Sequence, residues 1–133
     1  MNEKNNSLEN GCKGIKILVV DDIPPNIMLV KEYLKILGCE EDYATNGLEA
    51  IKCVQANKYD LCLMDFQMPE MGGIEATKII RETITKDMPI IALTGSATEE
   101  DLNEGLKTGM NDWLKKPIAI ETLSKAILHN VRK

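Results

Sequence analysis

Short apolar runs, separated by longer amphipathic stretches, constrain the fold of this chain more than any other feature. Each run has four to six residues, which is too short for a helix. The runs at 15–20 and 59–64 are apolar nearly throughout, as expected for strands that are buried on both faces of a sheet. Three further runs, of which the first is the least apolar, lie at 39–44, 89–93 and 111–114. We therefore predict five strands.

The stretches between these runs indicate helices. After Pro24 and Pro25, apolar residues recur at helical spacing until Gly38 ends the first helix. Asn46 and Thr98 are expected to cap two later helices. The predicted helices lie at 24–37, 46–56, from the loop 66–73 to about 82, at 98–109, and around 120–131. Because parallel strands need crossovers, this alternation predicts a doubly wound α/β fold with helices on both faces of a parallel sheet.

The length of 133 residues suits a single domain. Residues 1–14 are polar, rich in Asn and without periodicity, so we expect a disordered polar leader. The folded domain is then predicted to occupy residues 15–133, with no internal repeat or linker.

The composition excludes several classes of function. Acidic residues outnumber basic residues by 21 to 16, and a net charge of −5 gives no overall attraction for nucleic acid. No apolar run approaches the ~18–20 residues that span a bilayer, and no signal peptide opens the chain, so we expect a cytoplasmic domain without membrane contact. One histidine cannot supply a multi-histidine metal site. The four cysteines contain no C-x-x-C pair and are expected to be reduced thiols.

Polar residues stand where four of the predicted strands end: Asp21-Asp22, Asp65, Thr94 and Lys116. Taken singly, each is an ordinary turn, cap or surface residue. The carboxyl ends of parallel strands, however, meet at one edge of the sheet. Two carboxylates about 4 Å apart repel by about 4 kcal/mol at an effective dielectric constant of about 20. The cluster therefore predicts a hard cation, Mg²⁺ with Mn²⁺ as the alternative, and a metal, an ammonium and a hydroxyl together suit phosphoryl chemistry.

These residues resemble the receiver domains of two-component response regulators, over roughly residues 15–131. The resemblance is carried by the acidic pair Asp21-Asp22, M-D-F-Q-M-P-E-M-G-G around Asp65, A-L-T-G-S at Thr94 and G-M-N-D-W-L-K-K-P-I around Lys116. The chain has 43 residues from Asp22 to Asp65, 29 from Asp65 to Thr94 and 22 from Thr94 to Lys116. These separations are also similar to the family's. The resemblance implies the strand order 2-1-3-4-5 of flavodoxin-like and chemotaxis-regulator-like folds.

The resemblance also implies the phosphoryl chemistry. Asp65 would accept a phosphoryl group from a phosphohistidine on a sensor histidine kinase or a histidine-phosphotransfer domain. Lys116 would pair with Asp65 at rest and with a phosphoryl oxygen afterwards, and the Thr94 hydroxyl would bond another phosphoryl oxygen. Such a domain is a phosphoacceptor with at most slow self-dephosphorylation, and is not otherwise an enzyme.

The implied ligands of Mg²⁺ are Asp22, Asp65 and the backbone carbonyl of Gln67, with Asp21 helping directly or through water. The Lys116–Pro117 bond is commonly cis in the family, which would let Pro117 fix the approach of Lys116.

The resemblance also implies which residues carry the conformational switch and which set the lifetime of the phosphoryl group. Trp113 is either a core aromatic or a switch residue whose ring turns inward as Thr94 moves toward the phosphoryl group. Gln67, Gly95 and Ser96 lie where family members tune the phosphoryl lifetime. Gly95 replaces the usual alanine, and Gly72 stands where aspartate is frequent, so both loops are expected to be looser than usual.

Two other functions compete with this interpretation. A Mg²⁺-dependent phosphatase with an aspartate nucleophile would usually have a second acid two residues after the first, whereas Gln67 follows Asp65 here. A flavin-binding protein would need aromatic residues for stacking and a hydroxyl-rich phosphate loop, and aromatic residues make up 4% of the chain.

The sequence does not fully decide which proteins bind this domain. Asn26 and the stretches G-I-E-A-T-K-I-I-R and A-L-T-G-S-A favour a receiver of a hybrid sensor kinase, and a stand-alone receiver is the alternative. The face formed by 98–109, 111–114 and the last helix is open to an effector or to a second copy, which would give a phosphorylation-dependent dimer. The residues expected on the kinase-facing surface are Ile23, Pro25, Asn26, Leu29 and Ile118.

Overall fold

The computed structural model describes residues 8–68 and 71–131. Within these residues, five parallel strands form one sheet in the order β2-β1-β3-β4-β5, which confirms the predicted topology. The strands are β1 (Lys16–Val20), β2 (Glu40–Ala44), β3 (Leu61–Asp65), β4 (Ile90–Thr94) and β5 (Asp112–Lys115).

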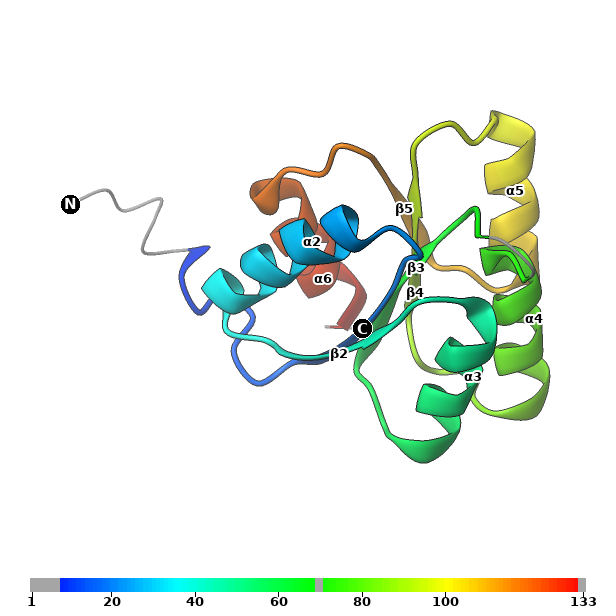
Figure 1. The fold of residues 1–133 in the computed structure, drawn as a ribbon, viewed down its shortest axis with the longest axis horizontal. Helices are drawn as coiled ribbons and strands as arrows, with labels where there is room; N and C mark the ends of the chain where they lie inside the picture. The colour runs from blue at the N-terminus through cyan, green and yellow to red at the C-terminus, as the bar shows by residue number, and fades with distance from the viewer. Residues whose placement is uncertain (1–7, 69–70, 132–133) are drawn as a thin grey trace.

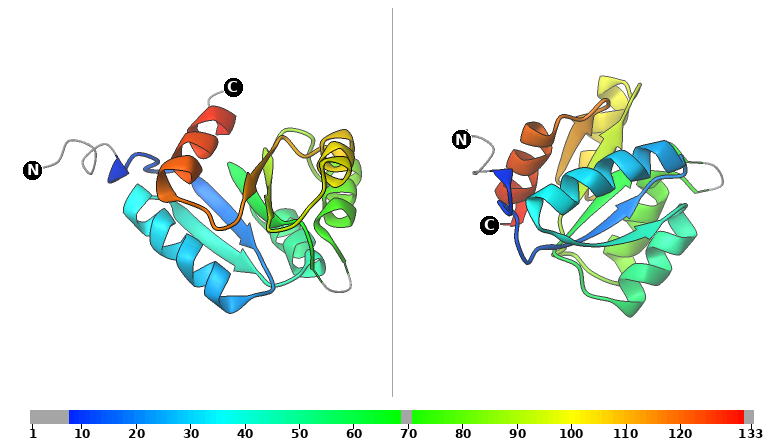
Figure 2. Two further views of the ribbon diagram at one scale, coloured as in Figure 1. Left: turned by 90° about the horizontal axis from the view of Figure 1, so that it is seen from above. Right: turned by 60° about the vertical axis from the view of Figure 1, so that its left-hand side comes forward.

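Helices cover both faces of the sheet, as the alternation predicts (Figures 1 and 2). One face packs against α2 (Pro24–Leu37) and α6 (Ile120–Val131). The other face packs against α3 (Gly47–Ala56), α4 (Gly73–Thr83) and α5 (Glu99–Thr108). Among the described residues, no helix combines the length and apolarity that crossing a membrane requires.

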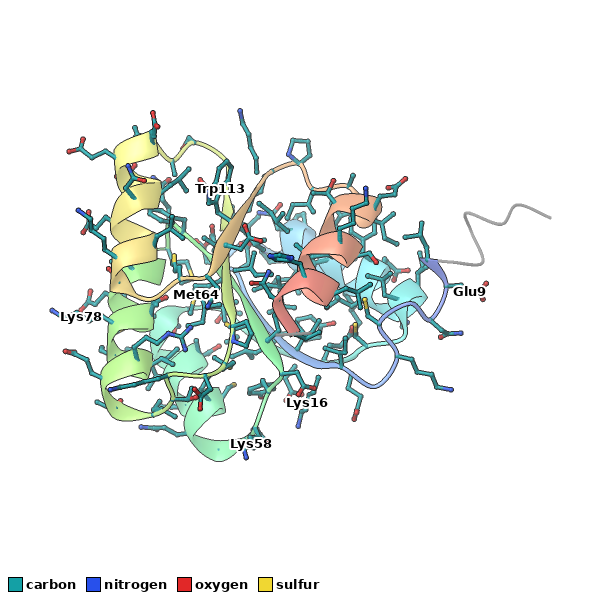
Figure 3. The ribbon with its side chains drawn as sticks, turned by 180° about the vertical axis from the view of Figure 1, so that it is seen from behind. Glu9, Lys16, Lys58, Met64, Lys78 and Trp113 are labelled. Carbon is teal, nitrogen blue, oxygen red and sulfur yellow. The ribbon has the colours of Figure 1, made fainter. Side chains whose placement is uncertain are left out.

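The two-residue period of the strands divides the core into two layers. In β1, Ile17 and Val19 belong to the cluster on the α2 and α6 side, while Leu18 and Val20 belong to the cluster on the opposite side. Met64 of β3 lies in the second layer (Figure 3). Because both faces are covered, every residue of β3 and β4 is buried, which explains why each strand is apolar up to its last residue, Asp65 or Thr94.

The helix ends follow the expected local chemistry. Asn46 accepts a hydrogen bond from the backbone N–H of Glu49 at 2.8 Å. Thr98 and Asp101 form a capping box, in which each side chain bonds the other residue's backbone N–H. Gly38 adopts the left-handed conformation at φ 83° and ends α2. These caps satisfy backbone groups that have no partner within the helix.

Three strands, β3, β4 and β5, end one residue later than the sequence predicts. Asp65 and Thr94 are the last residues of β3 and β4, and do not follow them as separate turn residues. Asp65 pairs with Leu93, and the backbone N–H of Phe66 still bonds the carbonyl of Leu93 at 2.9 Å. The polar side chains are therefore held by the rigid sheet ladder.

Residues 8–14 differ from the disordered leader expected for residues 1–14. Cys12 is 1% exposed and belongs to the core on the α2 and α6 side. The backbone N–H groups of Asn10 and Cys12 bond the carbonyls of Ile36 and Leu37, each at 2.8 Å. The last carbonyls of a helix have no partner within it, and this segment supplies donors to the end of α2. Residues 1–7 of the expected leader lie outside the described residues.

Gly73, the first residue of α4, allows that helix to start against the end of β3. A Cβ atom at this position would lie 2.6 Å from the carbonyl oxygen of Asp65 and 3.2 Å from the Cα of Phe66. Both of these are backbone atoms, so no side-chain rotation relieves the contact.

We therefore expect Gly73→Ala to lower the free energy of unfolding by about 1–3 kcal/mol, as overpacking does. The matched control is Gly95→Ala, because a Cβ there meets no atom within 4 Å, and its effect should stay within about 0.5 kcal/mol. Urea unfolding of both variants measures the difference. Equal effects of the two substitutions would contradict the proposed close approach.

Candidate functional site

Three carboxylates meet at the carboxyl edge of the sheet. Val20 and Met64 pair across β1 and β3, so the residues that follow them, Asp21 and Asp65, emerge side by side. Asp21 is 1% exposed, Asp65 is 5% exposed, and Asp22 is half-buried. One carboxylate oxygen from each of the three lies within 4.8 Å of the others. Aspartates that are far apart in sequence thus form one cluster.

The ammonium group of Lys116 joins two of these carboxylates. Its Nζ donates to Asp21 Oδ2 at 3.1 Å and to Asp65 Oδ1 at 3.2 Å. Lys116 directly follows β5, and its backbone N–H bonds the carbonyl of Thr94 at 2.8 Å. The long side chain therefore reaches back over the end of β4 to the carboxylates. The Lys116–Pro117 peptide bond is cis.

Burial and charge shift the pKa values of both partners. Burial raises the pKa of Asp65 to about 6, and the neighbouring Asp21 charge adds to this, although Lys116 acts in the opposite direction. Burial alone would lower the pKa of Lys116, but its hydrogen bond to Asp21 and the charges of Asp65 and Asp21 outweigh that effect and raise it. Lys116 is therefore a cation at neutral pH, and Asp65 is a destabilised carboxylate.

The cluster fits a hard divalent cation. With all three aspartates ionised, one ammonium group leaves the cluster with excess negative charge. The donors of the cluster are carboxylate oxygens, with no His or Cys among them, and oxygen ligands suit Mg²⁺. Within residues 8–68 and 71–131, this is the one group of three or more acidic, His or Cys residues that could hold an ion.

Asp21 has a second fixed contact in addition to Lys116. Its Oδ1 accepts a hydrogen bond from the backbone N–H of Ile23 at 3.0 Å. Both oxygens of this buried carboxylate therefore have partners. The sequence predicts Asp21 as a helper of the metal and pairs Lys116 with Asp65 alone, so it misses that Lys116 is shared. The pairing of β1 with β3 is the signal that could have revealed it.

Thr94 presents a hydroxyl next to the charged groups. It is 5% exposed, and its Oγ1 accepts a hydrogen bond from the backbone N–H of Ala97 at 2.9 Å. This contact uses a lone pair and leaves the hydroxyl hydrogen able to donate to a ligand. Gly95 and Ser96, which follow in the same loop, and Gln67 after β3 are all exposed.

Trp113 lies on the edge strand β5 and is 42% exposed (Figure 3). Together with Thr94, Ser96 and Leu102 it lines a cavity of about 210 Å³ between β5 and the loop after β4. The ring is therefore not a buried core aromatic, and it has space beside it on the side of the Thr94 loop.

A second cavity, of about 250 Å³, opens beside the carboxylates. Its lining includes Asp21 and Lys116 from the charged cluster, and Asn26, Leu29 and Ile118 from the expected kinase-facing surface. Ile118 is 7% exposed and thus lines the cavity without forming an open surface. The buried residues Val30 and Leu93 line it too, whereas Ile23 and Pro25 are exposed outside it.

The raised pKa of Asp65 predicts that Asp65→Asn stabilises the metal-free domain at pH 7 by about 1–3 kcal/mol. Between about pH 4 and pH 6, the folded state keeps a proton on Asp65 that the unfolded state releases. Stability therefore falls as the pH rises through this window, and an uncharged amide avoids that loss.

Denaturant titrations in the presence of a chelator, at pH 7 and pH 4, measure this effect. The gain from Asp65→Asn should shrink toward pH 4, and Asp87→Asn, at an exposed position, should change little at either pH. Destabilisation by Asp65→Asn at pH 7 would contradict the prediction.

Comparisons with known proteins agree with this geometry. The sequence matches the family model of the response regulator receiver domain over residues 17–128. Transcription factor SKN7 of Saccharomyces cerevisiae is 37% identical over 120 residues, which cover 90% of this chain and 19% of SKN7. Sensor protein GacS of Pseudomonas syringae pv. syringae is 39% identical over 117 residues, which cover 85% of this chain and 13% of GacS. The chain thus spans less than a fifth of the length of either relative.

Solved structures are similar over nearly their whole length. The receiver domain of sensor histidine kinase PA1611 from Pseudomonas aeruginosa is 33% identical and superposes with a TM-score of 0.84, covering 90% of this chain and 99% of that one. That structure has a magnesium ion coordinated in its active site cleft. On its sequence match, its fold and its clustered site, the chain belongs to the response regulator receiver domain family of two-component signalling.

Proposed function

We propose that Asp65 accepts a phosphoryl group from a phosphohistidine on a partner protein. The observation that carries this proposal is the contact of Lys116 with the buried Asp65 and Asp21 inside a cluster of three carboxylates. A buried aspartate without a chemical role would not need a lysine and two further carboxylates beside it. An aspartate that must hold a dianionic group needs positive charge fixed beside it in advance.

Asp22, Asp65 and the backbone carbonyl of Gln67 would hold Mg²⁺, with Asp21 helping directly or through water. When bound, the ion would neutralise part of the negative charge of the carboxylates and of the incoming phosphoryl oxygens. Mn²⁺ would serve in its place, because it also accepts carboxylate and carbonyl ligands.

The protein's own residues position the transfer. A carboxylate oxygen of Asp65 attacks phosphorus while the bond from phosphorus to the histidine nitrogen breaks, and the leaving imidazole keeps that electron pair. Lys116 would exchange its contact with Asp65 for one with a phosphoryl oxygen. The Thr94 hydroxyl, whose hydrogen is available to donate, would bond another. Positioning and charge neutralisation are the main requirements of such a transfer.

The movement of Thr94 toward the phosphoryl group would act on Trp113. Both residues line the cavity beside β5, so displacement of the Thr94 loop changes the space available to the ring. Inward rotation of the half-exposed ring would alter the surface of β5 and its neighbouring helices, where an effector or a second copy of the chain would bind.

The acyl phosphate would be lost by slow self-dephosphorylation, which makes the domain an acceptor and not a turnover enzyme. Gln67, Gly95 and Ser96 are exposed around the site and would set its lifetime by controlling water. An aspartate-based phosphatase is not favoured, because the chain matches receivers and has Gln67 where such enzymes have a second acid.

The partner would be a sensor histidine kinase or a histidine-phosphotransfer domain. Similarity to GacS supports a hybrid-kinase context, while similarity to SKN7 supports a separate regulator. The cavity between Asn26, Leu29 and Ile118 places apolar contacts beside Asp21 and Lys116, where a partner helix that carries phosphohistidine would dock. The four thiols suit a reducing compartment, so we place the domain in the cytoplasm.

Incubation with Mg²⁺ and acetyl phosphate should add one phosphoryl group to Asp65. Intact-protein mass spectrometry detects the addition, and peptide mapping locates the acid-labile group. Asp65→Asn should abolish it, whereas Asp87→Asn, with an exposed side chain remote from the cluster, should retain it. An unchanged signal in Asp65→Asn would refute the assignment.

The same reaction should change the fluorescence of Trp113, which is the single tryptophan of the chain. The cause is the altered environment of a ring that is 42% exposed before phosphorylation. Asp65→Asn should show no change under the same conditions. If emission stays constant while mass spectrometry shows phosphorylated wild-type protein, Trp113 is not the switch.

A further inference from the structure

Two thiols meet where residues 8–14 pack on the end of α2. Cys12 is buried at 1% exposure, and Cys39 follows the glycine that ends the helix and is half-buried. The thiol of Cys39 lies 3.6 Å from the carbonyl oxygen of Cys12, to which it donates. The segment approaches the α2 end in Figure 2, far from the carboxyl edge of the sheet that carries the charged cluster.

The backbones of the two segments are fixed against one another on both sides of the cysteines. The N–H of Cys12 bonds the carbonyl of Leu37 at 2.8 Å, and the N–H of Gly14 bonds that of Gly38 at 3.4 Å. On the β2 side, the N–H of Glu40 bonds the carbonyl of Ile15 at 2.9 Å. A disulfide requires Cα atoms within about 7 Å, and these hydrogen bonds hold the two segments side by side at the cysteines.

The two thiols also influence one another electrostatically. A hydrogen bond with the Cys12 side chain, together with burial, raises the pKa of the Cys39 thiol. Cys53 and Cys62 pack with the core on the opposite face of the sheet, so they cannot compete for this contact. Cys12 and Cys39 are thus a local pair, and the raised pKa keeps Cys39 in the thiol form at neutral pH, which slows its reaction with an oxidant.

We propose that Cys12 and Cys39 form a disulfide on oxidation, which fastens residues 8–14 to the turn between α2 and β2. The oxidant is hydrogen peroxide, which accepts the two electrons that the thiols lose. The sulfur of Cys39, the more exposed of the two, attacks one peroxide oxygen and becomes a sulfenic acid, with release of water. The sulfur of Cys12 then displaces the sulfenic oxygen, and a second water leaves. Two thiols and one peroxide give one disulfide and two waters.

The covalent ring from residue 12 to residue 39 encloses β1, α2 and the acidic pair Asp21-Asp22. Closing such a loop restricts the unfolded chain, so the oxidised domain is expected to unfold at a midpoint about 10 °C higher than the reduced domain. Residues 8–14 lie outside the match to the family model, which begins at residue 17. Cys12 thus lies in a part of the chain that the family model does not cover.

The test treats the whole chain with hydrogen peroxide and then blocks remaining thiols. Trypsin separates the cysteines into different peptides, since Cys12 falls in 5–13, Cys39 in 36–52 and Cys53 in 53–58. We expect a peptide of 5–13 joined to 36–52, with loss of two hydrogens, that disappears on reduction. The melting midpoint should rise in wild type and in Cys53→Ser, and should not rise in Cys39→Ser.

Cys39→Ser replaces a half-buried thiol by a hydroxyl of similar size and keeps the buried Cys12, so it tests the pair without opening the core. Any of three results would overturn the proposal. The first is a Cys39 that carries sulfinic acid with no link to 5–13, the second is a disulfide that runs through Cys53, and the third is a 12–39 link with an unchanged melting midpoint.

Discussion

The ammonium group of Lys116, shared between Asp21 and Asp65, is the interaction on which the site depends. Gathering three carboxylates, two of them buried, is unfavourable, because the buried groups lose water and all three repel one another. One lysine offsets part of this cost and leaves Asp65 with a raised pKa. The site is thus stable enough to fold, yet retains excess negative charge that a divalent cation can neutralise.

The sheet topology is what makes this interaction possible. The side-by-side strands β1 and β3 bring Asp21 beside Asp65, and Lys116 reaches them from the end of β5, across β4, where Thr94 sits. Every one of these positions ends or follows a strand that is bonded into the ladder. The rigid sheet therefore sets the spacing of the charges, while the loops after β3 and β4 hold exposed residues that can vary without disturbing it.

Much of this arrangement could be predicted from the sequence, because apolar runs, caps and polar strand ends are local signals. Asn46, Thr98 and Gly38 end or begin helices where the sequence indicates. The remainder depends on contacts between distant segments. Residues 8–14 look like a polar leader, yet they supply donors to the end of α2 and bury Cys12. Likewise, no local pattern reveals that Lys116 bonds Asp21 as well as Asp65.

The excess charge of the cluster calls for a divalent cation held on oxygen ligands. Crystals grown with Mn²⁺ test this directly, because the anomalous signal of manganese locates the ion independently of the model. We expect one strong peak bonded to carboxylate oxygens of Asp22 and Asp65. Strong peaks confined to surface carboxylates, with none between these two residues, would contradict it.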